Sequence, residues 1–228
     1  MRSINLFWGM CLLFLFTNTT LLAQKKAKEP SLNKQFKELR AAFAGIYEMR
    51  NTDESLPAAA RIPQDMLIFP IWEVKNEQWF YFAWLNPQLK DRPLEETLWR
   101  AYQDSTKPGK ILFDLYRIPN SKNYQYEWRK KQPYADLNPD LIIGEGDRCA
   151  GELNMLADKV YQAVSYEPCP REETGSSAAY TSILVDFKFS PKGFITFGNR
   201  HYDNKGNVVM QFDHSMPAKK VNTKLQSY

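Results

Sequence analysis

The sequence predicts a β-dominated fold, in which antiparallel strands run up and down around a single barrel behind an N-terminal helix. Three observations lead to this prediction. Short runs rich in aromatic and β-branched residues fill the chain after Ile46, and such runs are typical of strands. Turn sequences join several of these runs directly, which indicates hairpins. No regular helix separates most of the runs, and an antiparallel meander with this many strands removes its exposed edges by closing.

Residues 1–23 are typical of a secretory signal peptide. The apolar run at residues 6–16 is too short to span a bilayer as a helix, and Ala23 provides the small residue that precedes a cleavage site. We therefore expect a mature protein that begins at Gln24, is exported to the periplasm or the extracellular space, and has no membrane span. Cys11 would be lost with the signal peptide.

A polar linker, residues 24–30, leads to the predicted N-terminal helix. Ser31 is a suitable N-cap, and Gly45 is a suitable end. The apolar residues at helical spacing, which would lie on one face, are Leu32, Phe36, Leu39 and Phe43.

Alternating or apolar runs predict the strands of the barrel. They cover residues 66–74, 78–85, 110–118, 124–129, 160–167, 179–189, 193–202 and 208–213. Turn sequences at 75–77, 190–193 and 204–207 predict three hairpins between them.

Pro93 interrupts the succession of strands after the second hairpin strand. Proline suits the first turn of a helix, and Leu94, Leu98 and Ala101 share one helical face. This pattern predicts a short helix over a rim or a side of the barrel. The single domain would then cover residues 31–214, followed by a polar C-terminal tail at 215–228.

Composition excludes several classes of function. The formal charge is +4, and basic residues alternate with acidic ones, so no nucleic-acid surface is expected. The sequence has no nucleophile elbow, phosphate-binding loop or zinc-protease motif. His201 and His214 are too few to suggest a metal site, and we expect no required cofactor.

Cys149 and Cys169 remain after signal cleavage. Two cysteines in an oxidising compartment usually form a disulfide, which is the state we expect, and two free thiols are the alternative.

Aromatic residues crowd both faces of one predicted strand. One face would carry Trp79, Tyr81 and Ala83, and the other would carry Phe80, Phe82 and Trp84. The outer face therefore needs a cover. Packing of a helix is one account, and a ligand-lined cavity with a covered exterior is the other.

The sequence resembles the CpcT/CpeT chromophore lyases over about residues 32–212. The resemblance rests on the order of the elements and on these residues: Phe43-Ala44-Gly45-Ile46-Tyr47, Arg100, Gly109-Lys110-Ile111, Cys149, Cys169, Tyr180, Arg200-His201-Tyr202-Asp203, Gly206 and Val208-Val209. The chain departs from the family at Trp84, where the family carries a polar residue, and at 93–97, where basic residues are replaced by acidic ones.

The resemblance implies a lipocalin-like barrel and, as an activity, the attachment of bilins to cysteines of an acceptor protein. The implied ligand is elongated and either tetrapyrrole-like or otherwise lipophilic. The residues that would contact it are Trp84, Arg100, Tyr102, Arg200 and Asp203. The alternative is a non-catalytic extracytoplasmic binding or scaffold protein, whose barrel is filled by its own aromatic side chains. A protein acceptor and a homodimer are both compatible with this interpretation.

Overall fold

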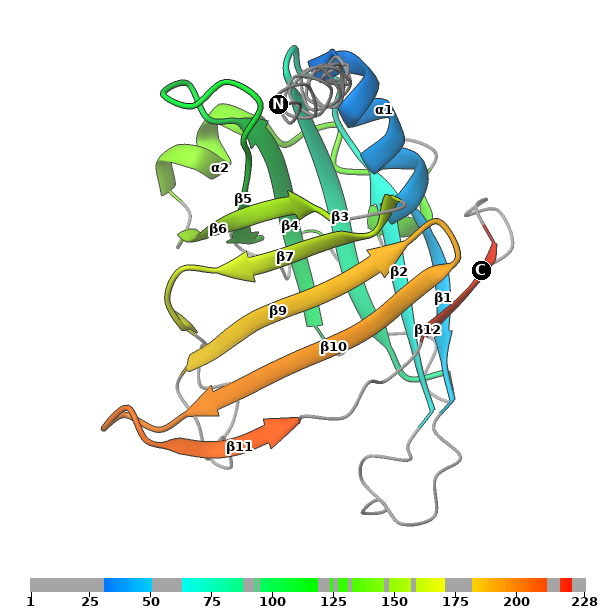
Figure 1. Ribbon diagram of the computed structural model, residues 1–228. Coiled ribbons are helices and arrows are strands. Elements are labelled where there is room, and N and C mark those ends of the chain that lie inside the picture. Colours follow the sequence, from blue (N-terminus) through cyan, green and yellow to red (C-terminus); the bar gives the residue numbers. More distant parts are fainter. Residues whose placement is uncertain are drawn as a thin grey trace, which may run out of the picture. The chain divides into compact units, whose positions relative to one another are not determined.

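A computed structural model describes residues 31–50, 63–87, 93, 95–118, 124, 127–130, 133–145, 148–156, 159–170, 182–212 and 218–222. These residues belong to one structural unit, Ser31–Tyr228, in which strands curl around an interior (Figure 1). The predicted signal peptide and linker, residues 1–30, lie outside the described residues.

The predicted N-terminal helix is confirmed as α1 (Leu32–Phe43). The carbonyl of Ser31 accepts hydrogen bonds from the amides of Lys34 and Gln35, at 2.9 and 3.0 Å. The buried side chains of this helix are Phe36, Leu39, Ala42 and Phe43. The helix ends at Ala44, which is already extended, so Gly45 begins the first strand instead of terminating the helix.

Antiparallel strands make up most of the remaining structure. They are β1 (Gly45–Met49), β2 (Gln64–Pro70), β3 (Glu77–Leu85), β4 (Glu95–Gln103), β5 (Ile111–Arg117), β6 (Arg148–Met155), β7 (Tyr161–Ser165), β8 (Cys169–Pro170), β9 (Ser182–Ser190), β10 (Gly193–Tyr202), β11 (Val208–Phe212) and β12 (Ala218–Asn222). The three predicted hairpins are confirmed as β2–β3, β9–β10 and β10–β11. Asn76 and Gly206 supply left-handed turn conformations, with φ of 64° and 80°.

The sheet is a curled half-barrel. Its strand order is β11-β10-β12-β1-β2-β3-β4-β5-β6-β7-β9-β8, and β9 also pairs with β10 along the whole of β10 (Figure 1). Among the described residues, β12 pairs with β10 at two positions only, opposite Gly193 and Phe194. Further along, β11 occupies the same edge of β10. The prediction of a β-dominated fold is confirmed. The predicted closed barrel is wrong, since the described residues of β12 and β10 pair at two positions only and the sheet remains a half-barrel.

The predicted helix after the second hairpin strand is also wrong. The segment forms β4, which pairs with β3 and β5 along its length. Leu98 and Trp99 are adjacent in sequence and point to opposite faces, yet both are buried. A strand that is buried on both faces has no clear alternation, so apolar spacing alone does not distinguish it from a helix.

Several other segments differ from the prediction, among them β8, which no predicted strand covers. The predicted strand at 124–129 contains the 3₁₀ helix η3 (Glu127–Arg129). The short helix α2 (Pro139–Glu145) and strand β6 were not predicted. Residues of the predicted C-terminal tail form β12, which pairs with β1. Of these, β12 pairs with β1 from the start of the domain, whereas β6 pairs with its neighbours in sequence, β5 and β7.

Candidate functional site

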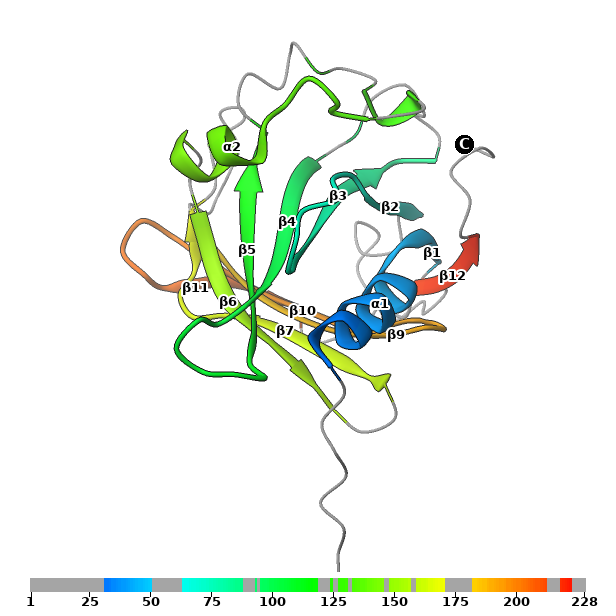
Figure 2. The same ribbon diagram turned by 90° about the horizontal axis from the view of Figure 1, so that it is seen from above.

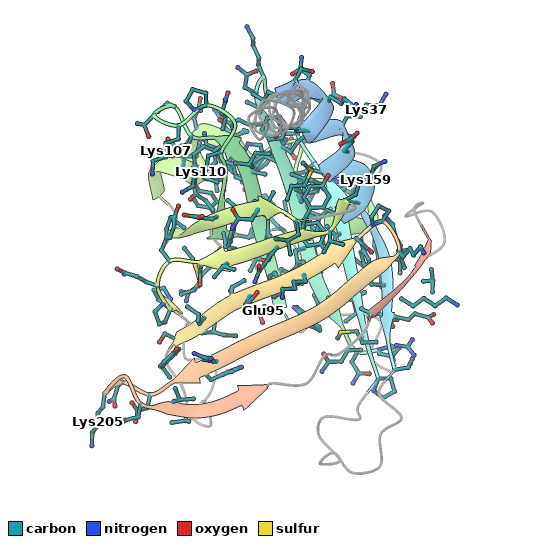
Figure 3. All side chains as sticks on the ribbon, in the orientation of Figure 1. Lys37, Glu95, Lys107, Lys110, Lys159 and Lys205 are labelled. Atoms are coloured by element: carbon teal, nitrogen blue, oxygen red, sulfur yellow. A yellow bond between two sulfur atoms is a disulfide. The ribbon has the colours of Figure 1, made fainter. Side chains whose placement is uncertain are left out.

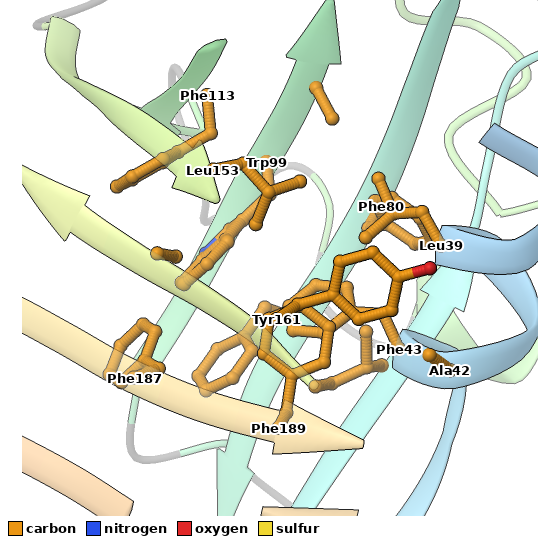
Figure 4. Close-up of a cluster of buried hydrophobic side chains, with 14 of the residues drawn as sticks. Leu39, Ala42, Phe43, Phe80, Trp99, Phe113, Leu153, Tyr161, Phe187 and Phe189 are labelled. Carbon is orange, nitrogen blue, oxygen red and sulfur yellow. The ribbon is translucent and has the colours of Figure 1, made fainter. Parts of the chain in front are cut away.

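The interior of the half-barrel is filled by aromatic side chains where α1 packs against it. Phe43 of α1 contacts Phe80 of β3, Trp99 of β4 and Phe189 of β9, with ring centroids 5.1, 5.3 and 4.6 Å apart (Figure 4). The cavity that remains is about 20 Å³ and is lined mainly by apolar side chains, which leaves room for about one water molecule. Pockets for drug-sized ligands measure roughly 300–1,000 Å³. This part of the interior is therefore core and has no room for such a ligand.

Further from α1, some inward-facing side chains are only partly buried, although Met66, opposite Trp84, and His201, opposite Ile183, are buried there. Trp84 lies four residues beyond Phe80 on β3, a distance of about 13 Å along the strand. Glu95 of β4 lies opposite Trp84, and Arg117 of β5 lies opposite Thr97. We call this group the distal inner face, and its partly or fully exposed members are Trp84, Glu95, Thr97, Leu115, Arg117 and Ile183. It combines an aromatic ring, apolar side chains and charges of both signs.

A disulfide borders the distal inner face. Cys149 and Cys169 are bonded, with Cα atoms 5.2 Å apart, as the sequence led us to expect. Cys149 lies opposite Leu115, and Cys169 lies opposite Ile183. Arg117 donates a hydrogen bond of 2.8 Å to the carbonyl of Pro170, the residue after Cys169. The disulfide therefore links β6 to β8 beside the strand that carries Arg117.

Arg100 and Tyr102 lie on the other, outer face of β4. The guanidinium of Arg100 donates two hydrogen bonds to the carboxylate of Glu77, one of them at 2.9 Å, and lies 3.9 Å from Asp114. It also stacks 4.4 Å from the centre of the Tyr102 ring. Burial acts to lower the pKa of Arg100, but its bonds with Glu77 raise that pKa above the usual value. Arg100 thus joins β3, β4 and β5 electrostatically.

Arg200 and Asp203 lie elsewhere. Arg200 is exposed on β10, in a neighbouring position to the buried, inward-facing His201. The carboxylate of Asp203 accepts hydrogen bonds of 2.8 Å from the amides of Lys205 and Asn207 in the β10–β11 turn. The Asn207 side chain also bonds to this carboxylate, which lowers the pKa of Asp203. Of the five predicted ligand contacts, the structure brings only Arg100 and Tyr102 together, and Trp84 faces the opposite side of the sheet.

The outer face of β2–β5 has a core of its own. Trp79, Tyr81 and Leu98 are buried there together with Tyr134 and Ile142, which belong to the connection between β5 and β6. Figure 2 shows α2 of this connection on the outer side of β5. The hydroxyl of Tyr81 donates to the carboxylate of Glu96 at 2.5 Å. Burial raises the pKa of Tyr81 and of Tyr134. The predicted need for an outer cover is thus met by the chain itself.

The sequence did not single out Glu95, Thr97, Leu115, Arg117 or Ile183 as a group. Only the strand register of β4 puts these residues on one face. That register was not predicted, because the segment after Pro93 was expected to be a helix. In the described part of the chain, no group of three or more metal-binding side chains lies together. Likewise, none of the described helices is long and apolar enough to cross a membrane.

The comparisons with known proteins show the fold alone. No protein-family model matches the chain, and no curated protein matches its sequence. Among solved structures, the chain is similar to the CRL protein of Arabidopsis, with a TM-score of 0.57 and 16% sequence identity. The match covers 83% of this chain and 97% of that chain. At the level of fold, this chain is therefore similar to the CRL protein.

Proposed function

We propose that this protein is a lipocalin-like binding protein that holds an elongated apolar or tetrapyrrole-like molecule against the distal inner face. One observation carries the proposal: the interior is filled near α1, whereas Trp84, Leu115 and Ile183 face inward and stay partly exposed further along the strands. A flat aromatic ring with apolar neighbours favours a large planar ligand. No side chain in this group forms a recognised catalytic arrangement, which favours binding over catalysis.

We also propose that the protein is exported from the cytoplasm. The apolar run at residues 6–16 and Ala23 support export, and the Cys149–Cys169 disulfide is of the kind that persists in oxidising compartments. N-terminal sequencing of protein from its own cells should begin at Gln24. Recovery of Met1 from a soluble cytosolic fraction would contradict export.

Ligand binding can be tested with two tryptophans on opposite faces of the sheet. Biliverdin, protoporphyrin and a fluorescent long-chain fatty acid are the probes. Trp84→Leu should weaken binding of the preferred probe about tenfold, because it removes an aromatic contact of roughly 1.5 kcal/mol. Trp72 is also half-buried but belongs to the outer core, so Trp72→Leu is the matched control and should leave the affinity unchanged. Equal effects of the two changes, or no saturable binding of any probe, would overturn the proposal.

The narrower proposal is that the protein attaches a bilin to a cysteine of an acceptor protein. The residues that resemble the CpcT/CpeT lyases and the likeness in fold support it. Incubation with a bilin and a cysteine-containing acceptor, followed by mass spectrometry, tests this activity. A covalent adduct that forms no faster than without the protein would restrict the function to binding.

A further inference from the structure

Arg117 and Thr97 form a cross-strand pair on the distal inner face. Arg117 is the last residue of β5 and lies directly opposite Thr97 of β4. Directly opposed side chains in antiparallel strands have Cβ atoms roughly 4.5–5.5 Å apart, so the two polar groups can reach one group of a ligand together. Both side chains are partly exposed. The pair therefore presents a guanidinium and a hydroxyl side by side on the inner face of the sheet.

Each of these two groups is oriented by a hydrogen bond. Nη2 of Arg117 donates a bond of 2.8 Å to the carbonyl of Pro170, beside the disulfide. The hydroxyl oxygen of Thr97 accepts a bond of 2.9 Å from the indole nitrogen of Trp99. Because that oxygen accepts from the indole, the hydroxyl proton of Thr97 is directed toward a different acceptor. Both groups are therefore hydrogen-bond donors, which suits an anionic oxygen.

Apolar and polar side chains occupy different depths of the distal inner face. Leu115 precedes Arg117 on the same face of β5, and the buried ring of Trp99 lies opposite Leu115. Glu95, the first residue of β4, is exposed at the end of that strand away from α1 (Figure 3). Trp84 lies opposite Glu95. A ligand can thus contact Leu115 and Trp84 with apolar atoms while its polar group stays near the strand ends.

We propose, on the basis of the proposed binding function, that Arg117 and Thr97 bind a carboxylate of the ligand and select an acidic amphiphile over a neutral molecule of the same shape. A guanidinium matches the two oxygens of a carboxylate in both charge and geometry, and the hydroxyl adds one donor. The opposing charge on this face, that of Glu95, is exposed and therefore well screened by water, whereas Arg117 is partly buried. Attraction to Arg117 thus outweighs repulsion by Glu95.

Acids and their esters measure the contribution of the carboxylate directly. Fluorescence titration gives dissociation constants for a fluorescent long-chain fatty acid and its methyl ester, and for biliverdin and its dimethyl ester. In at least one pair, the acid should bind the wild-type protein at least about tenfold more tightly than the ester, because the ester loses a charge-assisted contact. A preference in the first pair identifies the carboxylate of a lipid, and one in the second pair identifies a tetrapyrrole propionate.

Variants of the pair assign the preference to these two side chains. Arg117→Met should weaken binding of the preferred acid at least about tenfold and remove most of the preference over the ester. Arg40→Met is the matched control, because Arg40 is exposed on α1, and it should keep the preference. Thr97→Val should reduce the preference, whereas Thr97→Ser, which retains the hydroxyl, should keep it.

Unchanged far-UV circular dichroism and melting temperature will show that each variant folds, and the comparison of acid with ester in the wild-type protein needs no variant. Equal binding of acid and ester in both pairs would overturn the carboxylate site and leave the proposed binding function intact. An Arg117→Met variant that keeps the same preference as Arg40→Met would also overturn it. A wild-type protein that binds none of the four probes would overturn both the site and the binding function.

Discussion

Replacement of Arg100 by methionine should destabilise the fold strongly. The Arg100 side chain is 16% exposed and lies between Glu77, which is also 16% exposed, and Asp114, which is fully buried. Methionine retains much of the aliphatic volume but leaves two carboxylates without their cation. Removal of one partner from a buried ion pair costs about 3–5 kcal/mol, out of a typical total stability of about 5–15 kcal/mol. We expect a loss within that range, with the β3–β5 region affected first.

Urea unfolding, monitored by tryptophan fluorescence, measures this loss as a lower midpoint at constant m value. Arg200→Met is the control: Arg200 is exposed, so its replacement should change stability by less than about 0.5 kcal/mol. The double change Arg100→Met with Asp114→Asn should recover part of the loss, because it removes one uncompensated charge. If Arg100→Met cost no more than Arg200→Met, the structural role assigned to Arg100 would be refuted.

Three further predictions concern stability. Lys220 donates hydrogen bonds to the last carbonyls of α1, one of them at 2.9 Å to Ala41. Lys220→Met should therefore lower the free energy of unfolding, measured in urea, by about 1 kcal/mol. The control Lys219→Met changes an exposed position and should have almost no effect. Burial raises the pKa of Tyr116 to about 12, so its neutral form favours the folded state and stability should fall as the pH rises from about 10 to about 12. Tyr116→Phe should reduce the slope of stability against pH in this window, and an unchanged slope would contradict the assignment. Cys169→Ser removes the disulfide that closes a loop of 20 residues and should lower the stability measured by thermal unfolding by about 3 kcal/mol. A reducing agent should destabilise the wild type and leave the variant unchanged, and an equal effect on both would contradict this prediction.

Features encoded by neighbouring residues could be predicted from the sequence. The hairpin turns depend on local conformations such as those of Asn76 and Gly206, and α1 depends on the spacing of its own apolar residues. The alternation of Trp79 and Phe80 between two faces is confirmed by the two separate cores. The disulfide could be predicted because Cys149 and Cys169 are the only two cysteines beyond residues 1–23, the predicted signal peptide.

Features that depend on residues far apart in sequence could not be predicted. Arg100 was expected to face a ligand, but its bonding partner Glu77 lies 23 residues away and becomes a neighbour only through the β3–β4 register. The incomplete closure depends on where β12 meets β10. At that point Gly193 has φ of 141°, and a Cβ atom there would lie 2.1 Å from the carbonyl oxygen of Ala218. The distal inner face likewise exists only once β4 is recognised as a strand.

Native mass spectrometry of the protein purified gently from its own cells tests the proposed binding function most directly. The account predicts a complex heavier than the disulfide-bonded chain by one apolar or tetrapyrrole-like molecule, which is released on denaturation and is absent or much reduced in Trp84→Leu. The control Trp72→Leu should retain it. A wild-type protein at the mass of the polypeptide alone, which also takes up none of the added probes, would contradict the account.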